Sequence, residues 1–224
     1  MSKLVTSALL CAAAALPLSA PAVPVPCIQQ SYQDYVALGT DGCTSGPLTF
    51  SDFKFLGPDL DPTMITVDPV LGSLTFNVNM MVATMDGGQK SVTFTYTVAD
   101  DNGITAAALS FIGSAVDPDA DSRVKKTFED GTLEVFESTA VVDGKNVTTS
   151  KKSDSVTFTE PFPTSLDVSE TATVSVKPAG NIRAASINSF TNTFAGIPEP
   201  GTLALLLAGS ALALLARRRG LAAP

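Results

Sequence analysis

Hydrophobic and polar residues alternate along several parts of the chain. In the clearest case, segment 91–98, Val92, Phe94, Tyr96 and Val98 alternate with serine or threonine. Side chains with a period of two point to opposite faces of a β-strand, so this segment predicts an antiparallel strand with one buried face. Further strands are predicted for segments 74–80, 155–159, 171–176 and 186–194.

Short turn motifs separate these strand candidates. The motifs are Asp86-Gly87-Gly88, Asp101-Asn102-Gly103, Asp130-Gly131 and Asp143-Gly144. Such pairs favour tight hairpins because they tolerate positive φ, and the clearest hairpin is predicted for Val141–Val147. Segment 104–112 fits a strand or a helical turn, and no helical period is visible between the two ends of the chain. The pattern predicts an all-β fold, an antiparallel β-sandwich.

The first residues have the pattern of a targeting segment. Lys3 is followed by an apolar run, Leu4–Leu18, and then by Ala20-Pro21-Ala22. Small residues at these positions fit cleavage by signal peptidase, so we expect residues 1–22 to be a signal peptide. The alternative is a membrane helix, for which the run is short compared with the ~20 residues that span a bilayer.

The other end of the chain carries a second apolar run. Residues Gly201–Ala216 contain no charge and are followed by Arg217, Arg218 and Arg219. As a helix the run would rise about 24 Å, against a hydrocarbon core of about 30 Å. The arginines would stop it on the cytoplasmic side. We therefore expect a transmembrane helix in residues 196–224 and an exported domain in residues 23–195.

Pro198, Glu199 and Pro200 precede this run. Each proline restricts the residue before it to an extended conformation, so Glu199 is expected in the kind of backbone that proteases and transpeptidases grip. From physical reasoning alone, a cleavable anchor and an ordinary membrane anchor remain equal alternatives.

The order of these three elements resembles the PEP-CTERM sorting signal of Gram-negative bacteria. The resemblance implies recognition by an exosortase, a membrane enzyme similar to cysteine transpeptidases that cuts near the tripeptide and releases or transfers the protein. It also implies an association with exopolysaccharide and biofilm. Less specifically, the domain resembles uncharacterised PEP-CTERM proteins. The segments that carry this second resemblance are 34–39, 42–43, 50–53, 164–168 and 189–194.

Composition narrows the classes of function. The chain has 14 basic and 22 acidic residues and a net charge of −8, and four of the basic residues lie in the two terminal segments. An acidic domain argues against nucleic-acid binding, which needs a basic face. The absence of histidine excludes Ser-His-Asp and Cys-His catalysis. We expect no catalytic residues, no cofactor and no enzymatic activity, with a hydrolase built on two convergent carboxylates as the weaker alternative.

Two cysteines, Cys27 and Cys43, remain after removal of the signal peptide, which contains Cys11. An even pair in an exported protein predicts a disulfide.

Asp117, Asp119 and Asp121 alternate in the manner of calcium ligands. An EF-hand would require glycine at the sixth position and glutamate at the twelfth, where Ser122 and Phe128 stand. We therefore expect a solvated acidic turn here and keep the three aspartates as weak metal candidates.

The sequence thus predicts a non-enzymatic protein of the envelope or extracellular matrix, exported across the inner membrane, anchored there transiently and processed by exosortase. Signal peptidase and exosortase are the expected partner enzymes, and extracellular polysaccharide is a further candidate partner. The alternative is a calcium-stabilised adhesive or glycan-binding sandwich.

Overall fold

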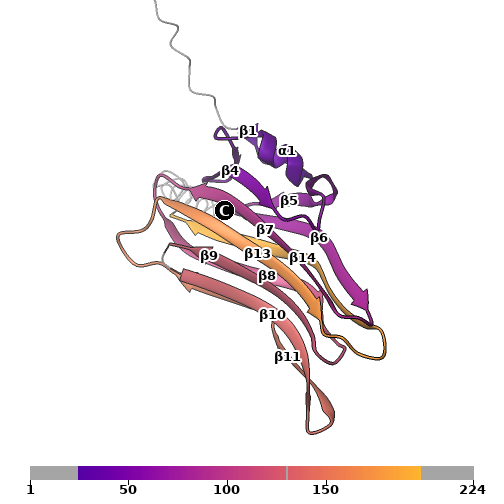
Figure 1. The fold of residues 1–224 in the computed structure, drawn as a ribbon. Coiled ribbons are helices and arrows are strands. Elements are labelled where there is room, and N and C mark those ends of the chain that lie inside the picture. Colours follow the sequence, from indigo (N-terminus) through magenta and orange to yellow (C-terminus); the bar gives the residue numbers. More distant parts are fainter. Residues whose placement is uncertain (1–24, 130, 198–224) are drawn as a thin grey trace, which may run out of the picture.

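The computed structural model describes residues 25–129 and 131–197, which form two stacked β-sheets (Figure 1). The prediction of an all-β sandwich is therefore confirmed. The expected signal peptide and most of the expected C-terminal membrane segment lie outside the described residues. Within residues 25–129 and 131–197, no helix is both long and apolar enough to cross a membrane.

One sheet has eight strands and the other has six. The larger sheet, in spatial order, consists of β1 (Val25–Pro26), β3 (Cys43–Ser45), β4 (Leu48–Leu56), β7 (Gly88–Ala99), β13 (Ser165–Val176), β9 (Ala120–Phe128), β10 (Gly131–Val142) and β11 (Lys145–Lys151). The smaller sheet consists of β12 (Ser153–Thr157), β8 (Ile104–Ser114), β14 (Arg183–Gly196), β6 (Ser73–Thr84), β5 (Thr66–Val70) and β2 (Gln30–Ser31). Among the described strands, neighbours pair antiparallel except for β1 and β3.

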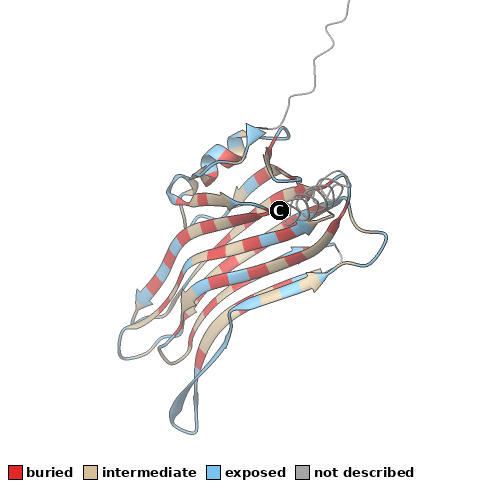
Figure 2. Cartoon of the chain, turned by 180° about the vertical axis from the view of Figure 1, so that it is seen from behind, coloured by how far each residue is buried: buried red, intermediate tan, exposed pale blue. Residues whose placement is uncertain are grey.

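The alternation read from the sequence decides which faces are buried, as the alternating colours along the strands show (Figure 2). Every second residue of β7 from Val92 to Val98 lies in the core. The same holds for β6 from Leu74 to Met80. These two strands place apolar residues between the sheets, and burial of such residues is the main force that holds the two sheets together.

Aromatic rings fill the middle of the core. Phe76 of β6 stacks on Phe190 of β14 with ring centroids 5.0 Å apart. Phe94 of β7 lies across the sandwich from them, 5.4 Å from Phe76 and 5.5 Å from Phe190. This cluster joins the two sheets at their centres.

The four turn motifs have two different roles. Asp143 and Gly144 both adopt positive φ and close the β10–β11 hairpin, which confirms that prediction. Gly131 begins β10, which pairs antiparallel with β9. Asp86-Gly87-Gly88 and Asp101-Asn102-Gly103 do not close hairpins, because each joins strands of opposite sheets. Segment 104–112 lies within β8, so the strand alternative is correct.

Two short helical elements were not predicted. They are α1 (Tyr32–Ala37) and the 3-10 turn η1 (Pro62–Met64). Ser31 and Asp34 form a capping box at the start of α1. The helix buries Tyr32 and Tyr35 against one end of the core.

Both ends of the domain lie at the same end of the sandwich (Figure 1). β1 pairs with β3, and the turn that follows β3 brings Pro47 next to Gly196, the last residue of β14. The β10–β11 hairpin projects from the opposite end. A membrane anchor on either terminus would therefore face the same direction.

We expect Phe94→Ala to lower the free energy of unfolding by about 3–5 kcal/mol, because it removes the ring that bridges the sheets and leaves a cavity. Thr95→Ala on the outer face of the same strand is the matched control and should change stability by less than about 0.5 kcal/mol. Urea unfolding followed by circular dichroism measures both values. Equal effects of the two substitutions would contradict this account of the core.

Candidate functional site

The described part of the chain ends at Ile197, the residue before Pro198. The backbone N–H of Ile197 donates to the carbonyl of Gly103 at 3.0 Å, so hydrogen bonding of the fold continues to the residue before Pro198. Gly196 lies against the carboxylate of the buried Asp100, where a side chain at this position would collide with the oxygen Oδ2. Pro198, Glu199, Pro200 and the arginines Arg217, Arg218 and Arg219 lie outside the described residues.

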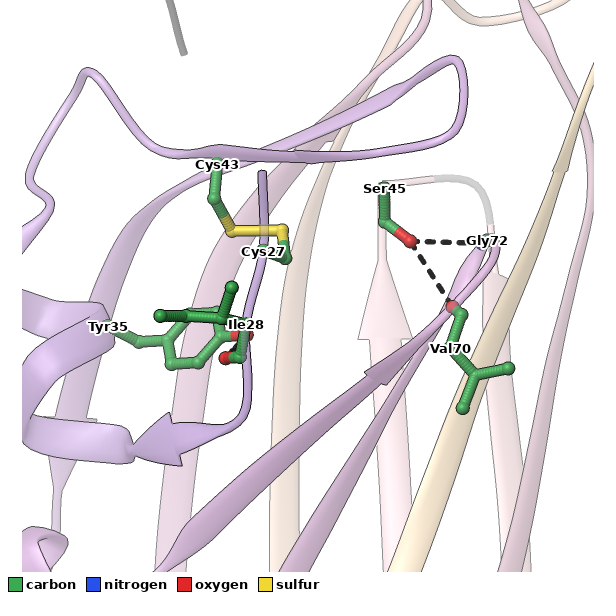
Figure 3. The surroundings of a disulfide bond; sticks show 7 residues. All are labelled: Cys27, Ile28, Tyr35, Cys43, Ser45, Val70 and Gly72. Atoms are coloured by element: carbon green, nitrogen blue, oxygen red, sulfur yellow. Dashed lines mark hydrogen bonds between the residues drawn. A yellow bond between two sulfur atoms is a disulfide. The ribbon is translucent and has the colours of Figure 1, made fainter. Parts of the chain in front are cut away.

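The predicted disulfide between Cys27 and Cys43 is present, with the two Cα atoms 4.9 Å apart (Figure 3). It joins the residue after β1 to the first residue of β3. The hydroxyl of Tyr35 on α1 donates to the carbonyl of Ile28 at 2.9 Å. The start of the domain is thus fixed to the larger sheet by a covalent bond and to α1 by a hydrogen bond.

The aspartates singled out as weak metal candidates lie around the loop that leads into β9. Asp119 accepts a hydrogen bond from the guanidinium of Arg183 at 2.9 Å, and the ammonium of Lys177 lies 3.7 Å from its other oxygen. Two cations therefore already neutralise this carboxylate.

The two neighbouring aspartates have separate partners. Asp117 accepts from the backbone N–H of Ala184 at 2.8 Å, and Asp121 pairs with Arg123 at 3.3 Å. In the part of the chain that the structure describes, no group of three or more acidic or cysteine side chains could hold a metal ion. The structure therefore distributes Asp117, Asp119 and Asp121 among different contacts.

The described surface contains a shallow hollow on the outer face of the larger sheet, lined by polar side chains that include Asp52, Lys54 and Asp167. All three tyrosines lie in the core, and no aromatic side chain is among the exposed large hydrophobic residues of the described ranges. Four phenylalanines are partly exposed in these ranges, namely Phe55, Phe136, Phe158 and Phe162.

A cluster of polar side chains lies fully buried between the sheets. Lys126 of β9, Glu170 of β13 and Asn192 of β14 have no solvent exposure, and Tyr96 of β7 has only 2 %. Glu170 and Lys126 face each other directly across neighbouring strands of the larger sheet, and Asn192 reaches them from the smaller sheet. Burial of a charged pair is costly unless other groups satisfy its polar atoms.

Every polar side chain of the cluster has a partner inside it. The Lys126 amine donates to the Asn192 carbonyl oxygen Oδ1 at 3.0 Å. The Asn192 nitrogen Nδ2 donates to Glu170 Oε2 at 2.8 Å, and the Tyr96 hydroxyl donates to Glu170 Oε1 at 3.3 Å. Glu170 Oε1 lies 3.8 Å from the Lys126 nitrogen. Lys126 also lies over the ring of Phe194, with its nitrogen 3.9 Å from the centroid.

Burial shifts the pKa values of the titratable groups in this cluster in the directions that favour their neutral forms. Desolvation lowers the pKa of Lys126 to about 8, although the negative charge of Glu170 opposes the shift. Desolvation raises the pKa of Glu170 to about 7, opposed by Lys126 and by the hydrogen bonds from Asn192 and Tyr96. The pKa of Tyr96 is well above its ordinary value because of burial and the nearby Glu170. Near neutral pH the uncharged forms of Lys126 and Glu170 are therefore far more populated in this cluster than they would be for the same side chains in water.

The sequence-based reasoning did not identify this cluster, although the sequence contains a signal for it. Lys126 is in phase with the buried positions Val124 and Phe128, and Glu170 is in phase with Val168 and Ala172. A charged residue at an apolar position of a strand marks a buried polar site, and two such positions on different strands indicate a pair.

Comparison with known proteins identifies the tail. Residues 196–219 match the family model of the PEP-CTERM protein-sorting motif, so the chain carries this motif at its C-terminal end. The match begins at the last residue of β14. The chain has no match among curated proteins. Among solved structures, TmCBM61 in complex with beta-1,4-galactotriose is similar at 10% identity over 72% of this chain and 97% of that chain. The TM-score of 0.25 is too low for this similarity to support a conclusion.

We expect the double variant Cys27→Ser/Cys43→Ser to lose about 3 kcal/mol of stability, because the disulfide closes a loop and restricts the unfolded chain. Urea titration of the two proteins measures the difference. Reduction of the wild-type protein should give the same loss and should leave the double variant unaffected. An unchanged unfolding midpoint in the double variant would contradict the expected contribution.

Proposed function

We propose that the protein is a non-enzymatic component of the cell envelope or extracellular matrix, delivered there by exosortase processing of its C-terminal tail. The observation that carries the proposal is the PEP-CTERM motif in residues 196–219, placed directly after the last strand of a complete β-sandwich. The motif implies export and processing at the membrane. The non-enzymatic role in the matrix is our inference.

The arrangement of the domain supports attachment through this end. Ile197 is still hydrogen-bonded to the fold, and Pro198 follows at once. An enzyme that acts on Pro198-Glu199-Pro200 would therefore work next to the folded sandwich, at the end where the N-terminal strand also lies. The β10–β11 hairpin would then point away from the membrane.

The composition of the strands supports a structural role. Hydroxyl groups pair across neighbouring strands on the outer faces of both sheets, with Thr93 and Thr171 3.0 Å apart and Thr75 and Thr191 2.9 Å apart. Such hydroxyl pairs add stability to a solvent-facing sheet. Together with the disulfide and the net charge of −8, they suit a soluble domain that must persist outside the cell.

We expect Glu199→Ala to keep the precursor in the membrane fraction, because it removes the charged residue of the tripeptide that exosortase recognises. Fractionation of the native host followed by an immunoblot against the β domain measures the distribution. Glu160→Ala is the matched control, since Glu160 is an exposed glutamate that also precedes a proline but lies in the folded domain. The control should be processed as the wild type is. Normal release of the Glu199→Ala protein would refute processing through this motif.

A further inference from the structure

The buried cluster places an amine beside an amide that it could attack. The Lys126 nitrogen lies 3.0 Å from the carbonyl oxygen of Asn192, and this amide is its one side-chain hydrogen-bond partner among the described residues. A neutral lysine amine is a good nucleophile, and the carbon of a primary amide is an acceptor for it. Intramolecular reactions between well-oriented groups reach effective concentrations of about 10⁵–10⁸ M.

Glu170 lies where a proton has to move. One carboxyl oxygen, Oε2, accepts from the Asn192 nitrogen at 2.8 Å, which is the group that would leave. The other, Oε1, lies 3.8 Å from the attacking nitrogen of Lys126. A single carboxyl group thus spans the nucleophile and the leaving group, and it can take a proton from one and give a proton to the other.

Burial lowers the cost of the uncharged reactants compared with water. Lys126, Glu170 and Asn192 are fully buried. Besides these side chains, the titratable groups that act on the cluster among the described residues include Tyr96, which donates to Glu170, and the buried Tyr32, whose pKa the charge of Glu170 helps to raise. The Phe194 ring covers the amine at 3.9 Å, and the Phe128 ring lies 6.0 Å away. Water is excluded, so hydrolysis does not compete and the amine is not held as a solvated ammonium.

We propose that Lys126 and Asn192 form an intramolecular isopeptide bond, with Glu170 as the catalytic acid and base. Lys126 first gives a proton to Glu170, and its neutral nitrogen then attacks the Asn192 side-chain carbon. The bond between Nζ and Cγ forms. Glu170 protonates Nδ2 and receives the second proton from Nζ, and the bond between Cγ and Nδ2 breaks to release ammonia. Glu170 remains protonated, so atoms and charge balance without any co-reactant.

The product removes the costly feature of the core. A buried ammonium and carboxylate are replaced by a neutral secondary amide and a neutral carboxylic acid, both of which are less expensive to bury. The bond would join β9 of the larger sheet to β14 of the smaller one and close a loop between residues that are 66 positions apart. The proposal does not depend on exosortase sorting, since the reaction needs only the folded domain.

Peptide mapping of the full chain tests the proposal. The wild-type protein, produced in a host without exosortase, is denatured, reduced and digested with trypsin for mass spectrometry. We expect a branched peptide in which segment 126–145 is joined to the peptide that begins at Ala184, with a mass about 17 Da below their sum because ammonia is lost. Recovery of only the unlinked peptides, with normal cleavage after Lys126, would overturn the proposal whatever the variants do.

Three variants assign the roles. Asn192→Ala and Glu170→Gln should give unlinked peptides, the first because the amide is missing and the second because glutamine keeps the shape but transfers no proton. Lys125→Arg is the matched control, because Lys125 is the exposed neighbour of Lys126 on β9, and it should remain cross-linked. Circular dichroism checks that each variant is folded. Complete cross-linking in folded Glu170→Gln would overturn the catalytic role of Glu170, and complete cross-linking in Asn192→Ala would overturn the assignment of Asn192.

Discussion

The central position of the last strand is the constraint on which the rest of the structure depends. β14 hydrogen-bonds to β6 on one side and to β8 on the other, so the smaller sheet is divided in two without it. Its inward side chains Phe190, Asn192 and Phe194 meet the larger sheet. The smaller sheet is therefore complete only once the chain up to Gly196 is in place, and the match to the sorting motif begins at that residue.

The buried polar cluster makes the same strand chemically unusual. Apolar residues at all three positions 126, 170 and 192 would pack between the sheets without any desolvation cost, and replacement of a whole buried ion pair by apolar residues is often neutral or stabilising. The core instead contains an amine, a carboxyl group and a side-chain amide, with the carboxyl group of Glu170 between the amine and the amide nitrogen. A reaction explains this arrangement better than packing does. Stability then follows from the covalent product and not from the ion pair.

The sequence was sufficient for the all-β class, for several of the strands and for the sorting motif. Strict alternation predicted the buried faces of β6 and β7, because a period of two leaves no other way to separate apolar from polar residues. It was not sufficient for α1, where six residues are too few to display a helical period and only the capping residues Ser31 and Asp34 mark the start. The turn motifs were ambiguous for a related reason. A turn sequence sets local φ, but which sheet the next strand joins depends on contacts far along the chain. Lys126, Glu170 and Asn192 come together through such contacts alone.

The positions of the buried cluster and of the sorting motif have a mechanical consequence. If exosortase transfers the chain to a carrier, any pull on the carrier enters the domain at Gly196 and acts along β14. The hydrogen bonds between β14 and its neighbours lie perpendicular to the strand, so they share such a load in shear, and Asn192 lies only four residues from the point of entry. A covalent link from Asn192 to Lys126 would pass the load to β9 in the other sheet before most of β14 is strained. The disulfide protects the other terminus at the same end of the sandwich, between β1 and β3. A domain that is attached through one end and exposed to flow needs its reinforcement at that end. The Cys27–Cys43 disulfide and the proposed link between Lys126 and Asn192 both lie there.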